Sequence, residues 1–259
     1  MTELTVRQAL QADRDAAALT WLARLQLATT QQILALGWPR VSRSIALRRL
    51  RGVRQVGLFE AVATKSGAGQ HVVLYRLTPA GAVAAATLLG DPQVIHGVRV
   101  TATEGIHLEH RLRVNDTILH LVDRLGQGAV EVLLPHQRRL RWQISGGAWH
   151  EVTPDVVLVF PEASTALMLE YDRGLRSLEN IAVQLQRYRE AVEQPDFSSR
   201  VARSSIVYVL HPPSPTRATA ILHAAAEAGV EARVAVIAAW DLATAVVDAI
   251  AKADAHRAS

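Results

Sequence analysis

Apolar residues recur three and four positions apart through the first third of the chain, which is the spacing of amphipathic helices. The first of these runs has its apolar positions at Ala18, Trp21, Leu22 and Leu25. A second run starts after Thr29-Thr30, which are good N-cap residues, and stops at the break Gly37-Trp38-Pro39. Ser42 then starts a third run, SRSIALRRLRGVRQVG. The pattern predicts three consecutive helices.

The pattern changes to short β-like runs after the third helix. LFEAVAT and HVVLYRLT are joined by KSGAGQ, a glycine-containing turn of hairpin type. Thr78-Pro79 predicts the cap and first turn of a further helix, PAGAVAAATLL. Three helices followed by a hairpin is the order of a winged helix-turn-helix, and the ending YRLTPAG resembles that of many winged-helix proteins. The resemblance implies that the third helix enters the major groove of DNA, with the hairpin on neighbouring backbone or minor groove.

Strands and helices alternate from residue 92 onward, after a linker region at GDPQV. The order is helix, three strands, helix, strand, helix, strand, helix. The helical segments are GIHLEHRLRVNDTILHLVDRLG, LENIAVQLQRYREAVE, SPTRATAILHAAAEAG and a last helix from near Trp240 to about Asp254. The strand segments are AVEVLLP, HQRRLRWQISGGAWHEV as a strand and turn, the hairpin-like pair VTPDVVLVF and TALMLEYD, SSIVYVL and ARVAVIA. The predicted fold class is α/β, α+β overall, with domains at residues 1–91 and 92–259.

Charge is unevenly distributed between these two predicted domains. The chain has a net charge of +4, but residues 1–90 hold 11 Lys and Arg against 4 Asp and Glu, a balance of +7. The remainder holds 17 against 20, a balance of −3. A basic first third indicates a nucleic-acid-binding domain followed by a second domain of a different kind. An arginine-rich helix can also be only a solvated face, but the helix, the turn before it and the hairpin after it agree in favouring DNA.

Candidate DNA contacts follow from this prediction, with double-stranded DNA as the partner. They are Arg40, Ser42, Arg43, Ser44, Arg48, Arg51 and Lys65. Arg43 and Ser44, at the start of the third helix, are the better candidates for base contacts. Arg40 and Lys65 look more like phosphate contacts, because most protein–DNA hydrogen bonds go to the backbone. For Arg48 and Arg51 an internal ion pair is the alternative.

Composition excludes several other classes of protein. The chain has no cysteine, so disulfides and thiolate metal sites are excluded. No apolar run approaches the roughly 20 residues that a membrane helix needs, and the N-terminus lacks the layout of a signal peptide. Neither G-x-x-x-x-G-K-[ST] nor G-x-G-x-x-G occurs, so nothing favours ATP or dinucleotide binding. We expect a cytoplasmic protein associated with the nucleoid or a plasmid.

Three carboxylates mark the ends of the paired strands VTPDVVLVF and TALMLEYD. Asp155 opens the first strand, and Glu170 and Asp172 close the second. Alternation along a strand places Glu170 and Asp172 on the same face. Such a cluster repels itself unless a metal ion or an arginine, Arg173 or Arg176, joins it. The alternative is that these residues only mark where buried strands reach water.

The order of elements in the second domain resembles the core of the PD-(D/E)XK nuclease superfamily. Pro154-Asp155 matches the first element of its motif and Glu170 the second. The resemblance implies that Asp155 and Glu170 bind Mg²⁺ or Mn²⁺, with Asp155, Glu170 and Asp172 as candidate catalytic residues. The chain departs from the motif at Asp172, where the superfamily has lysine, and no lysine occurs between residues 66 and 251. Gln184 and Tyr188, four apart on the next helix, either face the same end of the sheet or are a polar and a core-edge position.

A winged helix followed by TPDVVLVF, ALMLEYDRG and LENIAVQLQRYREAV resembles the replication-relaxation family of bacterial plasmids and integrated mobile elements. The resemblance implies a DNA-binding role in replication, relaxation, transfer or regulation of mobile DNA. Other replication or transfer proteins are possible partners, and a homodimer is expected because helix-turn-helix proteins often pair on two half-sites. Three hypotheses remain. The favoured one is a DNA-binding protein with an incomplete nuclease-like domain. The second is a metal-dependent endonuclease or nickase using Asp155 and Glu170, and the third is an assembly protein whose arginines bind an acidic partner.

Overall fold

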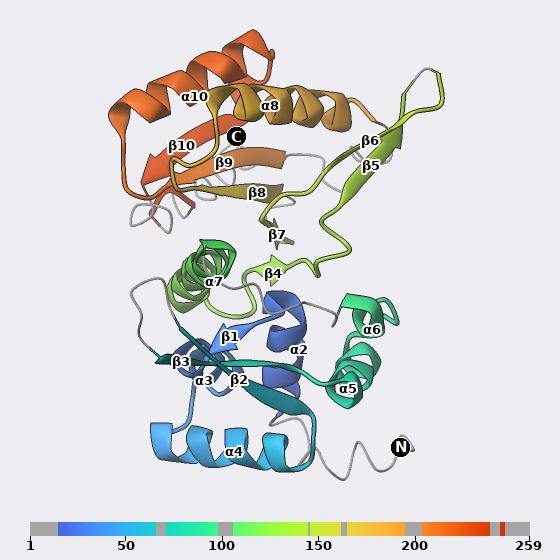
Figure 1. The fold of residues 1–259 in the computed structure, drawn as a ribbon, viewed down its shortest axis with the longest axis vertical. Helices are drawn as coiled ribbons and strands as arrows, with labels where there is room; N and C mark the ends of the chain where they lie inside the picture. The colour runs from blue at the N-terminus through green and yellow to red at the C-terminus, as the bar shows by residue number, and fades with distance from the viewer. Residues whose placement is uncertain are drawn as a thin grey trace, which may run out of the picture. The chain divides into compact units, whose positions relative to one another are not determined.

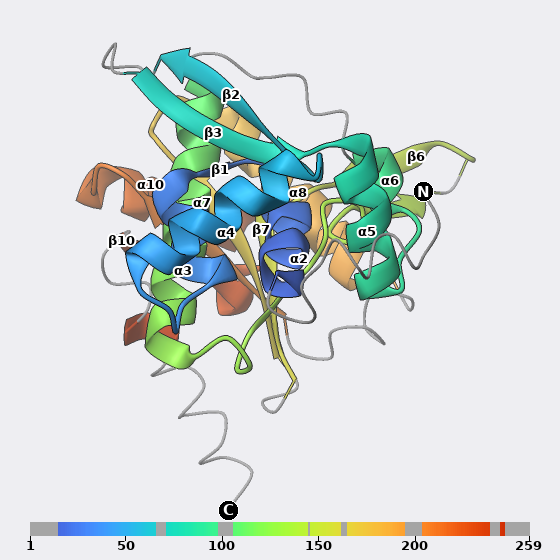
Figure 2. The ribbon, with the colours of Figure 1, turned by 90° about the horizontal axis from the view of Figure 1, so that it is seen from below.

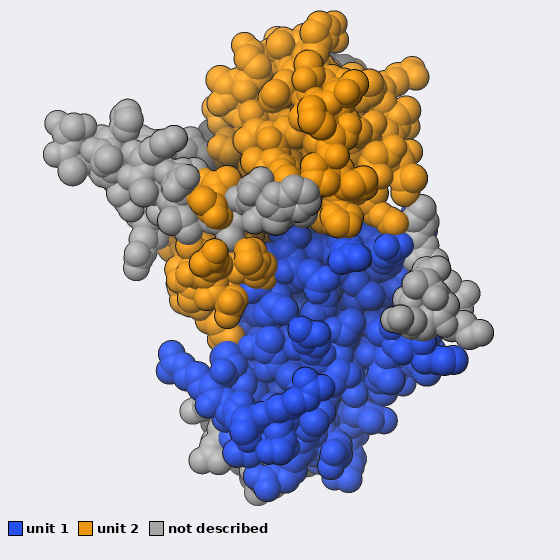
Figure 3. Space-filling model, turned by 90° about the vertical axis from the view of Figure 1, so that its left-hand side faces the viewer, with its two compact units in different colours: residues 1–119 blue, residues 120–259 orange. Residues whose placement is uncertain are grey.

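The computed structural model describes residues 15–65, 71–97, 106–144, 146–161, 165–194, 204–238 and 244–246. The chain is a mixed α/β protein, as predicted, with α+β character. It divides into two compact units, residues 1–119 and residues 120–259, which Figure 3 colours separately. The predicted domain boundary after residue 91 stays a prediction. In the described part of the chain, no helix combines the length and apolar character that crossing a membrane requires.

The first unit contains the three predicted helices and the predicted hairpin. Its elements are α2 (Ala16–Leu25), β1 (Ala28–Thr29), α3 (Thr30–Gly37), α4 (Arg43–Gln55), β2 (Phe59–Lys65), β3 (His71–Leu77), α5 (Pro79–Leu89) and α6 (Val94–Gly97). The helix α6 begins at Val94, the last residue of the predicted linker GDPQV, and the turn at residues 66–70 lies outside the described residues. In Figure 2, α4 faces the viewer with β2 and β3 beside it.

Side-chain caps fix where the helices of the first unit begin. The Thr29 hydroxyl accepts a hydrogen bond from the backbone N–H of Gln32 at 3.2 Å, and the Gln32 side chain accepts from the N–H of Thr29 at 3.0 Å. This reciprocal capping box satisfies two N–H groups that the start of α3 leaves without helical partners. Thr78 caps α5 in the same way, by accepting from the N–H of Gly81 at 3.0 Å. Both caps were predicted.

A two-residue strand, β1, enlarges the hairpin to a three-stranded antiparallel sheet. The sheet order is β1-β3-β2, with Ala28 opposite Tyr75 and Phe59 opposite Leu77. The order along the chain is therefore helix, short strand, helix, helix and hairpin. Sequence periodicity did not predict β1, because two residues are too few to show an alternation.

Buried polar bonds attach the first part of α7 (Ile106–Leu125) to the connection after α2 and to α3. Asn115 is 2% exposed and donates from Nδ2 to the Leu27 carbonyl at 2.6 Å. Gln32, equally buried, donates from Nε2 to Asp116 Oδ1 at 2.7 Å and to the Leu112 carbonyl at 3.0 Å. These bonds satisfy amides that would otherwise be costly to bury. Residues up to 119 in α7 therefore belong to the compact first unit.

The second unit is built on a five-stranded mixed sheet of order β10-β9-β8-β7-β4. Its strands are β4 (Glu131–Val132), β7 (Val156–Phe160), β8 (Thr165–Asp172), β9 (Ser204–Leu210) and β10 (Val234–Ala238). The β7–β8 pair is antiparallel, whereas β8, β9 and β10 are parallel to one another. The helices α8 (Leu178–Val192) and α10 (Pro215–Glu227) cover one face of the sheet (Figure 1). A 3-10 turn, Glu231–Arg233, precedes β10, and the predicted last helix lies largely outside the described residues.

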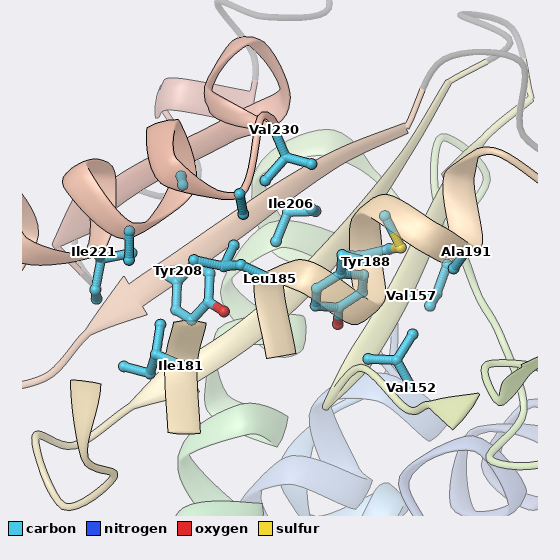
Figure 4. Packing of buried hydrophobic residues seen from close by; sticks show 14 of the residues in the cluster. Val152, Val157, Ile181, Leu185, Tyr188, Ala191, Ile206, Tyr208, Ile221 and Val230 are labelled. Carbon is cyan, nitrogen blue, oxygen red and sulfur yellow. The ribbon is translucent and has the colours of Figure 1, made fainter. Parts of the chain in front are cut away.

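A separate hairpin, β5 (Leu140–Gln143) and β6 (Trp149–Val152), forms its own two-stranded sheet. The core of the second unit lies between the five-stranded sheet and α8 and α10 (Figure 4). Its largest fully buried side chains include Tyr188 from α8 and Tyr208 from β9. A buried tyrosine needs a hydrogen-bond partner for its hydroxyl. Both hydroxyls find one at the predicted carboxylate site.

Candidate functional site

The structure places the predicted DNA contacts on and next to α4. Ser42 is the N-cap of this helix, and Arg40, Ser42, Arg43, Ser44, Arg48 and Arg51 are all exposed. Ser44, Arg48 and Arg51 are spaced by four and three residues, so they share one face of the helix. The opposite face is buried through Ala46, Leu50 and Val53. Lys65 is the last residue of β2, and its side chain is outside the described set.

No ion pair neutralises these arginines among the residues that the structure describes. The alternative of an internal ion pair for Arg48 or Arg51 is therefore not observed there. By contrast, Arg76 on β3 pairs with Glu60 on β2, with 2.5 Å between Nε and Oε1. Arg54, at the end of α4, lies over the ring of Tyr75 at 6.0 Å from its centroid. The exposed basic face of α4 thus stays open to an anionic ligand.

Strand register brings Asp155 and Glu170 together in the second unit. Val156 pairs with Leu169 across the antiparallel β7–β8 ladder, so Asp155, which precedes β7, lies beside Glu170. Asp155 is held at this position by two backbone contacts. Its Oδ2 accepts from the N–H of Tyr171 at 2.8 Å, and its carbonyl accepts from the Arg138 guanidinium.

Glu170 is the most enclosed carboxylate of the site, with 2% of its surface exposed. Its Oε1 accepts from the Tyr188 hydroxyl at 2.5 Å and from Gln184 Nε2 at 2.7 Å. Gln184 Oε1 in turn accepts from the Tyr208 hydroxyl at 3.2 Å. Of the two alternatives left open for Gln184 and Tyr188, the structure shows the first, because both side chains reach Glu170; Tyr188 is also fully buried in the core.

Burial and a second carboxylate make ionisation of Glu170 unfavourable. Removal from water raises the pKa of Glu170 from 4.5 to about 8, and the neighbouring Asp155 contributes to the rise. Hydrogen bonds from Tyr188 and Gln184 and the charge of Arg176 act in the opposite direction but do not cancel it. Burial also raises the pKa of Tyr188, so its hydroxyl stays a neutral donor. At neutral pH, without a further cation, Glu170 is mainly protonated.

Arg176 supplies positive charge at this site from the loop between β8 and α8. Its Nη1 lies 3.4 Å from Glu170 Oε2 and donates to Gln184 Oε1 at 2.5 Å. Glu170 Oε2 makes this contact at 3.4 Å, whereas Oε1 accepts two shorter hydrogen bonds, from Tyr188 and Gln184. Oε2 is therefore the less strongly bound oxygen of Glu170. The sequence identified Arg176 as one possible counter-charge, and the structure places it at Glu170.

Asp172 has a different partner from the other two carboxylates. Its Oδ2 lies 2.5 Å from Arg217 Nε, its Oδ1 accepts from Arg217 Nη2 at 3.1 Å, and Oδ1 also accepts from the N–H of Gly174 at 3.0 Å. This bidentate pair with α10 is nearly buried, with 6% of the Asp172 side chain exposed. The sequence did not predict Arg217, which is 45 residues from Asp172. A catalytic role for Asp172 stays a prediction.

Carboxylate oxygens such as those of Asp155 and Glu170 would suit a small divalent cation. Mg²⁺ is commonly held by one or two carboxylates plus several waters, and Glu170 Oε2 beside Asp155 offers such a pair. The pKa of Glu170 is raised mainly by burial and secondly by the charge of Asp155, so ionising both carboxylates together is unfavourable. Within the described residues, no group of three or more His, Asp or Glu side chains could hold a metal ion. Any metal here would therefore keep most of its coordination sphere as water.

These observations define a class of protein: a mixed α/β chain with an exposed basic helix in one unit and a buried carboxylate pair in the other. The family model described as replication-relaxation matches residues 19–202, which is well over half of the 259 residues. The chain therefore belongs to the replication-relaxation family, as the sequence predicted, and the family name points to a role in replication or relaxation. Comparison with curated proteins and with solved structures gave no match.

Proposed function

We propose that the chain is a DNA-binding protein acting in replication, relaxation or regulation of plasmid or mobile-element DNA. Its first unit would be a winged helix-turn-helix that docks on duplex DNA through α4. The observation that carries this proposal is the exposed face formed by Ser44, Arg48 and Arg51, with no acidic partner among the described residues. The order of helices and strands, including β1 beside β3, agrees with that class.

The positions on α4 divide the expected contacts by type. Arg43 and Ser44 lie in the first turn, the part of a recognition helix that reaches base edges. Arg40 precedes the helix and Lys65 ends β2, so both are proposed as phosphate contacts. Arg48 and Arg51 lie one and two turns further along the same face as Ser44. In this proposal the second unit is a nuclease-like scaffold that supports homodimer formation or contacts with other replication or transfer proteins.

The test is fluorescence anisotropy of a labelled duplex titrated with the full chain at several salt concentrations. The variant Arg48→Ala/Arg51→Ala should weaken binding and reduce the salt slope by about 1 for each phosphate that the protein no longer neutralises. The matched control is Arg187→Ala, which removes one exposed arginine from α8 and should leave binding unchanged. Equal affinity and equal salt slope for the double variant and wild type would contradict the proposal, as would a lack of salt-sensitive duplex binding.

The alternative function is a metal-dependent DNA endonuclease or nickase, favoured by the position of Asp155 beside Glu170. Mg²⁺ or Mn²⁺ held by these two residues would activate water and stabilise charge at the scissile phosphate. The missing lysine makes the binding function the preferred one. Incubation of supercoiled plasmid with the protein and Mn²⁺ decides between them. Nicking that is lost in Glu170→Ala and retained in Glu179→Ala, an exposed control on α8, would establish the nuclease; intact plasmid would reject it.

A further inference from the structure

The β5–β6 hairpin has two chemically different faces. Register pairs Gln143 with Trp149 and Arg141 with Glu151. Trp142 and Val152 point into the core of the second unit and are 6% and 5% exposed. Because side chains alternate along a strand, Arg141 and Trp149 point to the other face, toward solvent. Figure 1 shows this hairpin extending from the five-stranded sheet.

Trp149 is unusually open for a tryptophan. It is 57% exposed and is the one aromatic residue among the exposed large hydrophobic side chains of the described chain. The guanidinium carbon of Arg141 lies 4.4 Å from the centroid of the Trp149 ring, in cation–π contact. Arg141 has no carboxylate partner among the described residues. The hairpin therefore presents an exposed aromatic ring with a guanidinium over one of its faces.

Contacts on the inner face and near the turn anchor the hairpin that carries this pair. On its inner face, His150 Nδ1 lies 2.7 Å from Glu190 Oε2 on α8, and the His150 ring meets Trp142 edge-on with 5.9 Å between centroids. Near the turn, Gln143 donates from Nε2 to the Gly147 carbonyl at 3.0 Å. A packed inner face restricts the outer one, which lowers the conformational entropy that the hairpin loses when a ligand binds.

The positive charge of the hairpin indicates that its ligand is an anion. Residues 136–152 contain three arginines, Arg138, Arg139 and Arg141, and one acidic residue, Glu151. Arg139 pairs with Glu151, and Arg138 binds the Asp155 carbonyl, so Arg141 is the cation that remains for a ligand. An exposed aromatic ring next to a cation is the combination that binds single-stranded nucleic acid, where bases stack on rings and phosphates meet arginine.

We propose that Trp149 and Arg141 form a stacking site for an unpaired base of single-stranded DNA. Trp149 offers a ring face to the base, and Arg141 contacts the adjacent phosphate. Base faces in a duplex are covered by their neighbours, so this site discriminates in favour of separated strands. The choice of DNA over RNA rests on the proposed function of the first unit, but the site itself does not use α4.

The experiment uses the full chain and a fluorescein-labelled oligothymidylate of about 20 nucleotides, long enough for the single-strand sites known in other proteins. Trp149→Ala should weaken its binding about 5- to 100-fold, because one base–aromatic stack is removed. Trp149→Phe keeps an aromatic face and should recover most of the affinity. Leu175→Ala, at a residue that is 65% exposed, is the matched control and should bind like wild type.

Two further measurements separate stacking from charge and from the first unit. An abasic oligonucleotide of equal length should bind wild type about as weakly as oligothymidylate binds Trp149→Ala. Duplex affinity should be unchanged in Trp149→Ala and reduced in Arg48→Ala/Arg51→Ala. Loss of duplex binding alone would remove the proposed function and leave this site standing. Equal single-strand affinity for wild type and Trp149→Ala, or no single-strand binding by wild type, would overturn the stacking site.

Discussion

The pKa of Glu170 gives a quantitative prediction for the variant Glu170→Gln. Glutamine has the same shape without the charge, and its carbonyl oxygen can still accept from Tyr188 and Gln184 as Glu170 Oε1 does. The folded protein keeps a proton on Glu170 up to about pH 8, whereas the unfolded chain releases it near 4.5. Between these values the folded state holds a proton on Glu170 that the unfolded chain has released, so the contribution of Glu170 to wild-type stability falls as pH rises.

The size of this stability difference follows from the pKa shift of Glu170. Each pKa unit corresponds to about 1.4 kcal/mol, so the penalty of ionising Glu170 reaches a ceiling of roughly 4–5 kcal/mol above pH 8. Glu170→Gln does not carry this penalty. The stability of the variant relative to wild type should therefore be constant below about pH 4.5 and increase by up to ~1.4 kcal/mol per pH unit between 4.5 and 8.

Urea unfolding of the full chain at constant ionic strength, from pH 5 to pH 9 with chelator present, measures this difference. Glu179→Gln is the control, because it removes an exposed carboxylate from the same helix, α8, and should give a profile parallel to wild type. If the free energies of unfolding of Glu170→Gln and wild type change in parallel with pH, Glu170 ionises normally. That result would contradict its enclosure by Tyr188, Gln184 and Asp155. Adding Mn²⁺ should flatten the wild-type slope if a cation binds the ionised pair.

Two further stability predictions test the packing around the helices. Gly81→Ala should destabilise by about 1–3 kcal/mol or more, because its Cβ would lie 2.0 Å from the Leu58 carbonyl oxygen. Gly52→Ala, in α4 with open space around it, should stabilise by up to about 1 kcal/mol, and thermal melting of both variants checks the contrast. Arg217→Ala should cost about 3–5 kcal/mol by leaving Asp172 buried without its cation. Arg189→Ala, in an exposed pair with Glu193, should cost less than about 0.5 kcal/mol in the same urea assay, and similar destabilisation in the two arginine variants would contradict the buried-pair interpretation.

Sequence patterns predicted the elements that rest on local rules. The caps at Thr29 and Thr78 are short-range hydrogen bonds between neighbours in the chain, and the structure contains both. The pairing of Asp155 with Glu170 was also predictable, because two apolar runs joined by a short turn leave few registers that bury both strands.

Other features depend on contacts between distant residues, and no local pattern indicates them. The strand β1 exists because Ala28 and Thr29 meet Tyr75 and Leu74. Likewise, Tyr208 looked like an ordinary residue of a buried strand, and only packing against α8 shows that its hydroxyl reaches Gln184. The exposed Trp149 was not recognised either, because the sequence alone did not resolve HQRRLRWQISGGAWHEV into two strands with opposite faces.

The structure gives a physical role to Asp172, the residue at which the sequence departs from the nuclease pattern. Where that pattern has lysine, this chain has an acid that binds Arg217. Arg217 also donates from Nη2 to the carbonyl of Arg176 at 2.6 Å, and the Arg176 side chain reaches Glu170 Oε2. Asp172 thus helps to position the loop that carries a cation to the buried pair. Arg176 supplies positive charge at Glu170, and a metal ion at Glu170 Oε2 would have to share that oxygen with Arg176 or displace it. That competition is a physical reason to rank DNA binding above catalysis for this chain.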